Sequence, residues 1–596
     1  MIPELIRACY SWYEFRPDSS VLLASHCPEA VVSMLRERCR EVLSIEDITP
    51  GRKFDYIIDH EGMTSCKDIP ARISYLQSLL SPDGTMLLVF GNRYGLKYFC
   101  GTPDPVTGVA FDGINGYMDN VPEEGRLYSK NEVEKFLGNT EHKFYYPLPD
   151  ISMPQLIYSD NFREASPARE RLLDYDYSDR SMFGLEHRIL PDAIEEGALP
   201  FLSNSFIVET GKLSDIDLAV ITEDRGPLFG MATTVRSSGR VIKRPLYKEG
   251  ADHLKKLASY TSDLKSKNVP VLDTIYGEDS FGPYLSSEYV TYGNLGNRMR
   301  ADAASDITTL EAAFDKIRSY VIAASGSYHV DEVTGETILS KAYIDLAPFN
   351  AFEAGDDILF YDQEFLSEDT PLEYVMYRML KYFFQYAHEI KDEGYKKSLF
   401  DRYGIAGELI SKYEKREEDF ISRVRSRERY EELYKMATPD REMIRIRIRK
   451  LTEDGNKPYR IGYVPGVFDL LHSGHINLIR RCKERCRSLI VGVLTDDLVE
   501  YYKNKRPVMP LEERRAVLEA LSYVDETVAV DMSNTDKLDA WEQLHYDCHF
   551  SGDDHVGHWN DVLTELRKRG SNMEFFPYTE GISSTAIKEK MKGDKE

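Results

Sequence analysis

The sequence has no long hydrophobic run. No stretch approaches the roughly 18 apolar residues that a membrane-spanning helix needs. The opening residues, Met1 to Leu5, also lack the basic and apolar regions of a secretory signal peptide. We therefore expect neither a membrane span nor a signal peptide, and we expect the protein to be cytoplasmic.

Closely spaced cysteines are also absent. The eight cysteines are scattered, and the nearest two, Cys482 and Cys486, lie four residues apart in a helical pattern. That spacing fits neither a zinc site nor a redox motif. Buried, reduced thiols are the expected state.

Positively charged residues are fewer than negatively charged ones. The chain has 75 Lys and Arg against 100 Asp and Glu, which gives a net charge of −25. This excess of acid argues against nucleic acid as a partner, although a local basic pocket can still hold phosphates. Hydrophobic residues at 42% and charged residues at 29% indicate a folded chain rather than a disordered one. At about 150 residues for a typical domain, 596 residues predict two to four domains.

Changes in the apolar pattern divide the chain into four parts. Residues 1–225 form the first part, and its first 120 residues alternate strands with helices, as βαβ units on a parallel sheet do. Residues 226–405 begin with two strands around a tight turn and continue as an α+β region, and residues 406–457 form a charged helical connector. Residues 458–596 start a second alternating series. We expect a multidomain α/β protein whose first and last parts are Rossmann-like.

The strongest functional pattern follows an expected strand at residues 461–464. It reads GVFDLLHSGH over residues 466–475 and leads into a helical pattern. His472 and His475, at a strand-to-helix switch, can converge on one phosphate at the positive end of the helix. Imidazole donors placed there stabilise the charge that builds on an α-phosphate when a phosphate oxygen attacks it. The pattern therefore predicts nucleotidyl transfer.

Three further segments supply groups that bind phosphate. Lys503 and Lys505 follow the next expected strand, where flexible cations can hold a triphosphate and the leaving pyrophosphate. Arg514 opens a helical segment. The run TEGISSTAI at residues 579–587 combines glycine, hydroxyls and free helix amides, which are the ingredients of a phosphate cradle.

Together these motifs resemble the cytidylyltransferase family, in particular glycerol-3-phosphate cytidylyltransferase and its relatives that act on phosphocholine and phosphoethanolamine. The resemblance covers about residues 459–592. It implies that His472 and His475 contact the CTP phosphates and that Lys503 and Lys505 position substrate and triphosphate. The other residues that it implies are Arg514 and the nucleotide-binding residues Gly466, Phe468, Asp469, Asp553, Asp554, Gly581, Ile582, Ser583, Ser584 and Thr585, with Mg²⁺ on the triphosphate.

Two positions depart from the family pattern. His555 stands where relatives carry an aromatic residue, and Tyr578 stands where an arginine is usual. One triphosphate contact is therefore missing or supplied from elsewhere, which leaves the substrate open. Sugar-phosphate adenylyltransferases carry a similar histidine motif, so ATP in place of CTP is one alternative, and a non-catalytic scaffold for glycan assembly is another. The segment at residues 581–583 favours CTP.

The middle of the chain carries a second pattern. Lys243 lies on an early strand, Asp345 and Asn350 are five residues apart on a loop, and Asp362 ends a later strand. A kinase needs this arrangement: Asp345 would accept the proton of the substrate hydroxyl, Asn350 and Asp362 would hold Mg²⁺, and Lys243 would bind ATP phosphates. The pattern resembles the kinase-like fold of protein kinases and small-molecule phosphotransferases over about residues 228–401. An inactive module is the alternative, because the glycine loop is reduced to residues 237–239 and no glutamate partner for Lys243 is evident.

The first part of the chain resembles a class I methyltransferase. The run LSPDGTMLLV at residues 80–89 is similar to the late helix, turn and strand of that family, and residues 91–98 continue a variant seen with surface-polysaccharide genes. The cofactor of that family needs a glycine-rich turn after the first strand, but residues 22–28 read LLASHCP. Glu46 or Asp47 could still bind ribose hydroxyls, but we expect a degenerate domain without methyl transfer.

We therefore expect three joined domains with one active cytidylyltransferase. It would convert CTP and a phosphorylated small alcohol into a CDP-alcohol, such as CDP-glycerol, and pyrophosphate, for cell-surface polymer synthesis. An internal kinase that uses ATP could supply the phosphorylated alcohol. A homodimer through the C-terminal domain is the expected assembly.

Overall fold

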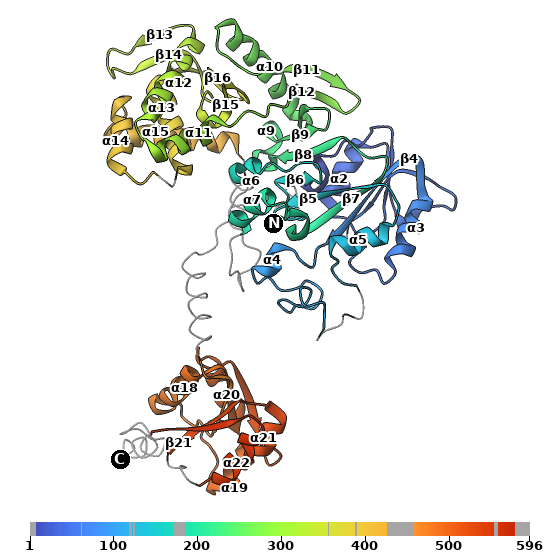
Figure 1. Ribbon diagram of the computed structural model, residues 1–596, viewed down its shortest axis with the longest axis vertical. Helices are drawn as coiled ribbons and strands as arrows, with labels where there is room; N and C mark the ends of the chain where they lie inside the picture. Colours follow the sequence, from blue (N-terminus) through green and yellow to red (C-terminus); the bar gives the residue numbers. More distant parts are fainter. Residues whose placement is uncertain are drawn as a thin grey trace. The chain divides into compact units, whose positions relative to one another are not determined.

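The computed structural model describes residues 7–60, 62–118, 122, 125–171, 186–355, 357–387, 390–425, 457–553 and 558–577. The chain divides into two compact units, Met1–Asp440 and Arg441–Glu596 (Figure 1). Each unit is described by itself. Within the described residues, no helix combines the length and apolarity needed to cross a membrane.

The first unit is built on a mixed sheet of twelve strands. Its strands are β1 (Ser20–Leu23), β2 (Glu41–Ser44), β3 (Phe54–Asp59), β4 (Leu80–Gly91), β5 (His142–Leu148), β6 (Leu156–Ser159), β7 (Ser205–Gly211), β8 (Ile216–Ile221), β9 (Met231–Arg236), β10 (Arg240–Pro245), β11 (Ile275–Asp279) and β12 (Gly282–Glu288). They lie in the order β11-β12-β10-β9-β8-β6-β5-β7-β4-β3-β1-β2 (Figure 1). Strands β1 to β4 pair in parallel, and every other neighbouring pair in this sheet is antiparallel.

The parallel end of this sheet is buried on both faces. Because successive side chains of a strand point to opposite faces, Met86 and Leu88 of β4 enter one hydrophobic core, while Leu87 and Val89 enter another. Helix α2 (Glu29–Arg38) connects β1 to β2, and α3 (Ile69–Leu79) connects β3 to β4. The side chain of Asp68 caps the first turn of α3 by accepting a hydrogen bond from an amide. The expected βαβ alternation is therefore present here.

The sheet continues without a break across residue 225, where we expected a domain boundary. Strand β8 lies before that residue and β9 after it, and the two pair antiparallel from Ile216 with Arg236 to Ile221 with Ala232. The segment that joins them includes α9 (Gly226–Phe229). The four-part division thus stays a prediction, while the sheet joins the first part to the strands that carry Lys243.

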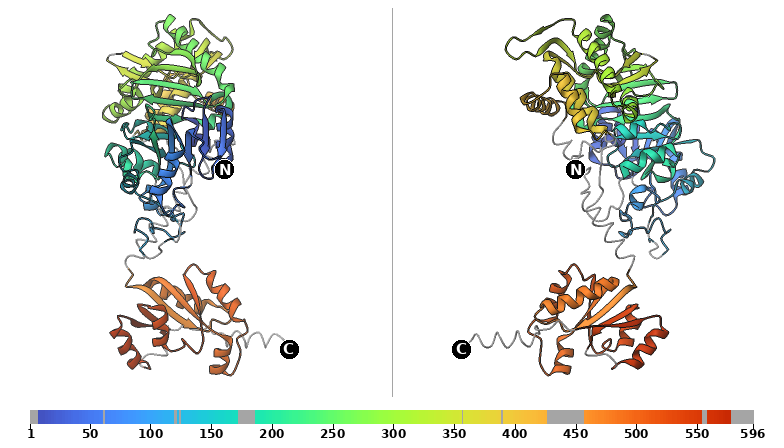
Figure 2. Two further views of the ribbon diagram at one scale, coloured as in Figure 1. Left: turned by 90° about the vertical axis from the view of Figure 1, so that its right-hand side faces the viewer. Right: turned by 60° about the vertical axis from the view of Figure 1, so that its left-hand side comes forward.

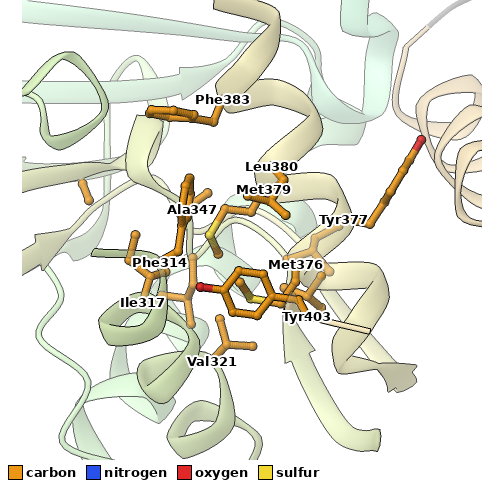
Figure 3. Packing of buried hydrophobic residues seen from close by; sticks show 14 of the residues in the cluster. Phe314, Ile317, Val321, Ala347, Met376, Tyr377, Met379, Leu380, Phe383 and Tyr403 are labelled. Carbon is orange, nitrogen blue, oxygen red and sulfur yellow. The ribbon is translucent and has the colours of Figure 1, made fainter. Parts of the chain in front are cut away.

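The rest of the first unit is a mixed helical region. Its elements are α10 (Ala251–Ser266), α11 (Leu295–Ser305), α12 (Thr309–Ser325), α13 (Leu372–Tyr386), α14 (Glu393–Arg402) and α15 (Glu408–Val424), with β13 (Tyr328–Val330), β14 (Thr337–Tyr343), β15 (Ala351–Ala354), β16 (Asp357–Phe360) and β17 (Leu366–Pro371). Helices α12 and α13 pack through one apolar face each (Figure 3). The facing residues recur at helical spacing: Phe314, Ile317 and Val321 on α12, and Met376, Met379, Leu380 and Phe383 on α13.

The second unit is a parallel five-stranded sheet. Its strands are β18 (Tyr459–Gly466), β19 (Cys486–Leu494), β20 (Glu526–Val530), β21 (Cys548–Gly552) and β22 (Asn572–Phe576), in the order β20-β19-β18-β21-β22. Its helices are α18 (Ser473–Arg485), α19 (Asp496–Lys503), α20 (Leu511–Glu519), α21 (Lys537–Leu544) and α22 (Asn560–Lys568), and they cover both faces of the sheet (Figure 2). Ile479 of α18 and Leu518 of α20 enter one core, while Ala540 of α21 and Leu566 of α22 enter the other.

This second unit has the Rossmann-like architecture that we expected. The strand order reverses at β18, because β19 lies on one side of it and β21 on the other. In open parallel sheets, ligands bind beyond the carboxyl ends of the strands at such a switch point. The GVFDLLHSGH segment begins at the carboxyl end of β18.

Candidate functional site

The turn between β18 and α18 brings the two predicted histidines together. His472 is the residue that precedes α18, and His475 lies in the first helical turn. Their rings stack with centroids 3.9 Å apart and planes 21° apart, and the Phe468 ring lies edge-on to His475 at 5.4 Å. Both residues therefore lie at the start of the helix, where free amides gather and a phosphate can bind.

The backbone of this turn is unusual. Phe468 and Leu470 both have a φ of +50°, a region that costs energy for residues other than glycine. Phe468 is buried, and a Cβ atom on Gly466 would come within 2.8 Å of its ring. The predicted residues Gly466 and Phe468 thus shape the turn that presents the histidines.

Both histidines are held in the neutral form near pH 7. The pKa of His475 is lowered to about 4, chiefly by burial; His472 and Lys503 act in the same direction, and Asp469 acts in the opposite direction. Burial also lowers the pKa of His472. Within the described part of the chain, Nδ1 of His475 is buried without a hydrogen-bond partner. A buried polar atom of this kind is available to a ligand.

Asp469 ties the histidine turn to the segment that follows Lys503 and Lys505. Its buried carboxylate accepts hydrogen bonds at 3.0 Å from the amides of Val508 and Met509. Lys503 is the last residue of α19, and both lysines are exposed. The lysine side chains therefore extend from a segment that is fixed to the turn. That placement agrees with the predicted role of the lysines, and that role stays a prediction.

Arg514 donates a hydrogen bond to a protein group from each of its three guanidinium nitrogens. Its side chain is 0% exposed, Nε donates to the Met509 carbonyl at 3.0 Å, and Nη1 donates to the Val467 carbonyl at 2.7 Å. Nη2 pairs with Asp496, which the sequence did not single out. Acidic residues are common in the first turn of a helix, because they interact favourably with the helix dipole. Nothing in the sequence therefore indicated this pairing. The predicted contact of Arg514 with phosphate stays a prediction.

The remaining predicted residues of this unit lie partly beyond the described chain. Asp553 is exposed and directly follows β21, at the same edge of the sheet as the histidine turn. Asp554 and the segment from Gly581 through Ile582, Ser583 and Ser584 to Thr585 lie outside the described residues, as do His555 and Tyr578.

In the first unit, the structure brings Lys243 and Asp362 together on the wall of a cavity. The cavity has a volume of about 720 Å³ and is lined by both residues, by Val220, Val235 and Val241, and by residues 285–294. Nζ of Lys243 pairs with Asp362 and also with Glu364, at 2.7 Å from Oε1. Glu364 is thus the partner of Lys243 that the sequence did not reveal.

Asp345 and Asn350 lie behind this cavity rather than in its lining. The Asp345 carboxylate accepts hydrogen bonds from the amides of Glu364 and Phe365 at 3.1 and 3.0 Å, and it pairs with Arg378 at 3.1 Å. Burial raises its pKa to about 6, against the lowering effect of Arg378. The Asn350 amide donates to the Asp345 carbonyl at 3.3 Å. Both residues therefore support the segment that carries Asp362, and their predicted roles in catalysis and metal binding stay predictions.

The carboxyl end of β1, where a methyltransferase needs its glycine-rich turn, is filled by a side chain. Arg72 donates from Nη2 to the Ala24 carbonyl at 2.7 Å and pairs with Asp59 at 2.6 Å. Asp59 ends β3, the neighbour of β1. The expected loss of a cofactor site in the first part of the chain stays a prediction.

Comparisons with known proteins bear on the second unit. The family model described as cytidylyltransferase-like matches residues 463–590. Glycerol-3-phosphate cytidylyltransferase of Bacillus subtilis is 35% identical over 128 residues, which are 22% of this chain and 94% of that protein. This chain belongs to the cytidylyltransferase-like family. The chain is therefore a nucleotidyltransferase, as the histidine motif predicted.

Other relatives of the cytidylyltransferase-like unit carry different names. FAD synthase of Thermococcus kodakarensis is 35% identical over 122 residues, which are 20% of this chain and 80% of that protein. Ethanolamine-phosphate cytidylyltransferase of Dictyostelium discoideum is 37% identical over 142 residues, which are 24% of this chain and 38% of that protein. These similarities each cover about a quarter of the chain or less.

Proposed function

We propose that the second unit transfers the cytidylyl group of CTP to a phosphorylated small alcohol, giving a CDP-alcohol and pyrophosphate. The stacked, neutral pair of His472 and His475 at the start of α18 is the observation that carries this proposal. Two of the relatives are named as cytidylyltransferases of phosphorylated alcohols, glycerol 3-phosphate and ethanolamine phosphate. A product of this kind suits the synthesis of cell-surface polymers.

The geometry supports a direct displacement. A phosphate oxygen of the alcohol attacks the α-phosphorus of CTP, and the bond from that phosphorus to the pyrophosphate oxygen breaks. Neutral imidazoles donate N–H groups to the nonbridging oxygens, where charge increases in the transition state. Lys503 and Lys505, which are exposed at and just after the end of α19, would neutralise the leaving pyrophosphate. Mg²⁺ would enter with the triphosphate as part of the substrate.

Pyrophosphate release by the intact protein tests this proposal. CTP with glycerol 3-phosphate or ethanolamine phosphate should release pyrophosphate, and ATP with the same acceptors should release much less. Greater release with ATP would favour adenylyl transfer, the alternative that the similarity to FAD synthases supports, since FAD contains an adenylyl group. If neither nucleotide gave pyrophosphate with any of a broad panel of phosphorylated alcohols and sugars, the result would favour the non-catalytic scaffold for glycan assembly.

We also propose that the first unit binds ATP in this cavity and transfers a phosphate from it to an alcohol. The phosphorylated alcohol is then the substrate of the second unit. The meeting of Lys243 and Asp362 on the cavity wall favours this second function. A kinase makes the phosphomonoester that a cytidylyltransferase consumes, and joining the two in one chain raises the local concentration of the intermediate.

Supplying an unphosphorylated alcohol together with ATP, CTP and Mg²⁺ tests the second function. The intact protein should form a CDP-alcohol, and Lys243→Met should abolish this route while activity on the phosphorylated alcohol is kept. Lys248→Met is the matched control, because Lys248 lies after the end of β10 and outside the lining of the cavity. Absence of ATP consumption with every alcohol tried would refute the phosphotransfer and leave the cytidylyl transfer standing.

A further inference from the structure

Arg225 is a second partly buried cation on the cavity wall, beside Lys243. It lies in the segment between β8 and β9, and its Nη1 pairs with Oε2 of Glu364, while Lys243 uses Oε1 of the same carboxylate. The side chains of Arg225, Lys243 and Glu364 are 20%, 11% and 7% exposed. One carboxylate therefore holds two cations side by side on the cavity wall.

A stability role does not account for this cluster. Taking charges out of water carries a large desolvation cost, and a buried ion pair is seldom more stabilising than apolar residues of the same volume. Here Arg225, Lys243, Asp362 and Glu364 all line the same cavity, so the cluster faces space that a ligand can enter. A charged lining of this kind points to a charged ligand.

The rest of the cavity limits what that ligand can be. Its sheet wall is apolar, with Val220 on β8, Val235 on β9 and Val241 on β10. The end with its two paired cations and the apolar wall together fit a molecule that has a flat apolar part and an anionic part able to bind those cations. The volume of about 720 Å³ is in the range of small-molecule sites.

We propose that Arg225 is a phosphate-binding residue of this cavity, acting beside Lys243, and that Glu364 is the positioning residue that holds both. This inference rests on the proposed phosphotransfer function of the first unit. A guanidinium has five N–H donors in a planar fork, and within the described residues the structure records one side-chain hydrogen bond of Arg225, from Nη1. The other donors are suited to two oxygens of one phosphate, or to oxygens of neighbouring phosphates.

The phosphate-binding arginine lies in a different segment from the turn that the sequence indicated. We expected the turn at residues 237–239 to be the remnant of a glycine loop, but the described lining of the cavity includes Thr222 and Arg225 and no residue of that turn. An arginine side chain in the segment between β8 and β9 would thus do part of what backbone amides do in a glycine-rich loop.

Calorimetry on the full-length protein tests this assignment, with saturating CTP present to occupy the second unit. The probes are adenosine, ADP with Mg²⁺ and ATP with Mg²⁺. Arg225→Gln should weaken binding of ADP and ATP by about 10- to 100-fold, as the loss of a hydrogen bond to a charged group does, and should leave adenosine binding within about twofold. Arg225→Lys should restore part of the loss, because it returns the charge but not the fork. Arg240→Gln is the matched control, since this arginine on β10 bonds to Ser286 and lies outside the lining.

The outcomes separate the two proposals. Wild-type protein that binds no adenine nucleotide, or binds one with an affinity that Lys243→Met does not change, would refute the phosphotransfer function and this inference with it. Arg225→Gln protein that binds ADP as the wild type does would overturn the role of Arg225 alone. Equal weakening of adenosine and ADP, together with a lower unfolding temperature, would also overturn it, because that result marks a structural residue.

Discussion

Arg514→Ala distinguishes an arginine that holds the nucleotidyltransferase site together from one that contacts substrate. The fully buried guanidinium donates to the carbonyls of Val467 and Met509 and pairs with Asp496. Its removal leaves two carbonyls and a carboxylate without their donors. Breaking a buried pair by deleting one partner costs about 3–5 kcal/mol. Because Asp496 is 30% exposed and water can reach it, we expect the free energy of unfolding of the second unit to fall by about 3 kcal/mol.

Urea unfolding of the full-length protein measures this change. Two of the three tryptophans, Trp541 and Trp559, lie in the second unit, so their fluorescence reports mainly on that unit. Arg515→Ala is the matched control, because the neighbouring side chain is 31% exposed and contacts Thr527 and Glu519. Its effect should stay within about 1 kcal/mol.

The kinetics complete the test. If Arg514 positions the turn, Arg514→Ala should lower stability and activity together, and the activity loss should follow the loss of ordered structure. A variant that unfolds at the wild-type urea concentration but has lost about 10²-fold or more in kcat would refute the positioning role. That result would instead support a direct contact between the guanidinium and the transferred phosphate.

Three further predictions concern the two sites. His475→Ala should lower cytidylyl transfer by about 10²-fold with little change in unfolding temperature, as the loss of one transition-state donor does; near-normal pyrophosphate release would contradict it. Burial lowers the pKa of the His475 ring from 6.5 to about 4, so the unfolded chain takes up a proton that the native ring does not. The stability of the second unit should therefore fall as pH drops from 6.5 towards 4, by at most about 1.4 kcal/mol per pH unit from this group, and His475→Gln should reduce that slope in urea unfolding at several pH values. Asp345→Asn should abolish CDP-alcohol formation from an unphosphorylated alcohol, because its carboxylate holds the amides of Glu364 and Phe365. Activity on the phosphorylated alcohol should be unchanged, and an unaffected ATP-dependent route would show that Asp345 is dispensable.

Local sequence patterns predicted the nucleotidyltransferase fold and the place of its histidines. His472 and His475 are three residues apart, and any helix that begins between them brings their rings to the same end. The strands of the second unit were also readable, because each is a short apolar run between helical patterns. The family comparison confirms this part of the interpretation.

Pairings between distant residues could not be predicted. Lys243 and Glu364 are 121 positions apart, and their contact depends on how β10 lies against the loop after β16. The resemblance to the cytidylyltransferase family implied a phosphate contact for Arg514, but the sequence did not indicate that packing buries this side chain completely. The antiparallel pairing of β8 with β9 was equally hidden, because a change of apolar pattern marks a domain boundary and a sheet continuation alike.

The continuous sheet of the first unit limits how its cavity can open and close. Val220, Val235 and Lys243 lie on β8, β9 and β10, which pair in sequence, and β8 is hydrogen-bonded to β6 and so joins them to the rest of the twelve strands. Because this wall of the cavity belongs to a twelve-stranded sheet, we expect it to move less than a small separate lobe would. We expect any closure over a ligand to come from the helical region after residue 294, which lies outside this sheet. Cutting the chain at residue 225 would leave the edge of β9 that pairs with β8 without its partner, and unpaired edges promote aggregation. We therefore expect that β9 and β10, the strand that carries Lys243, do not fold separately from the strands before them.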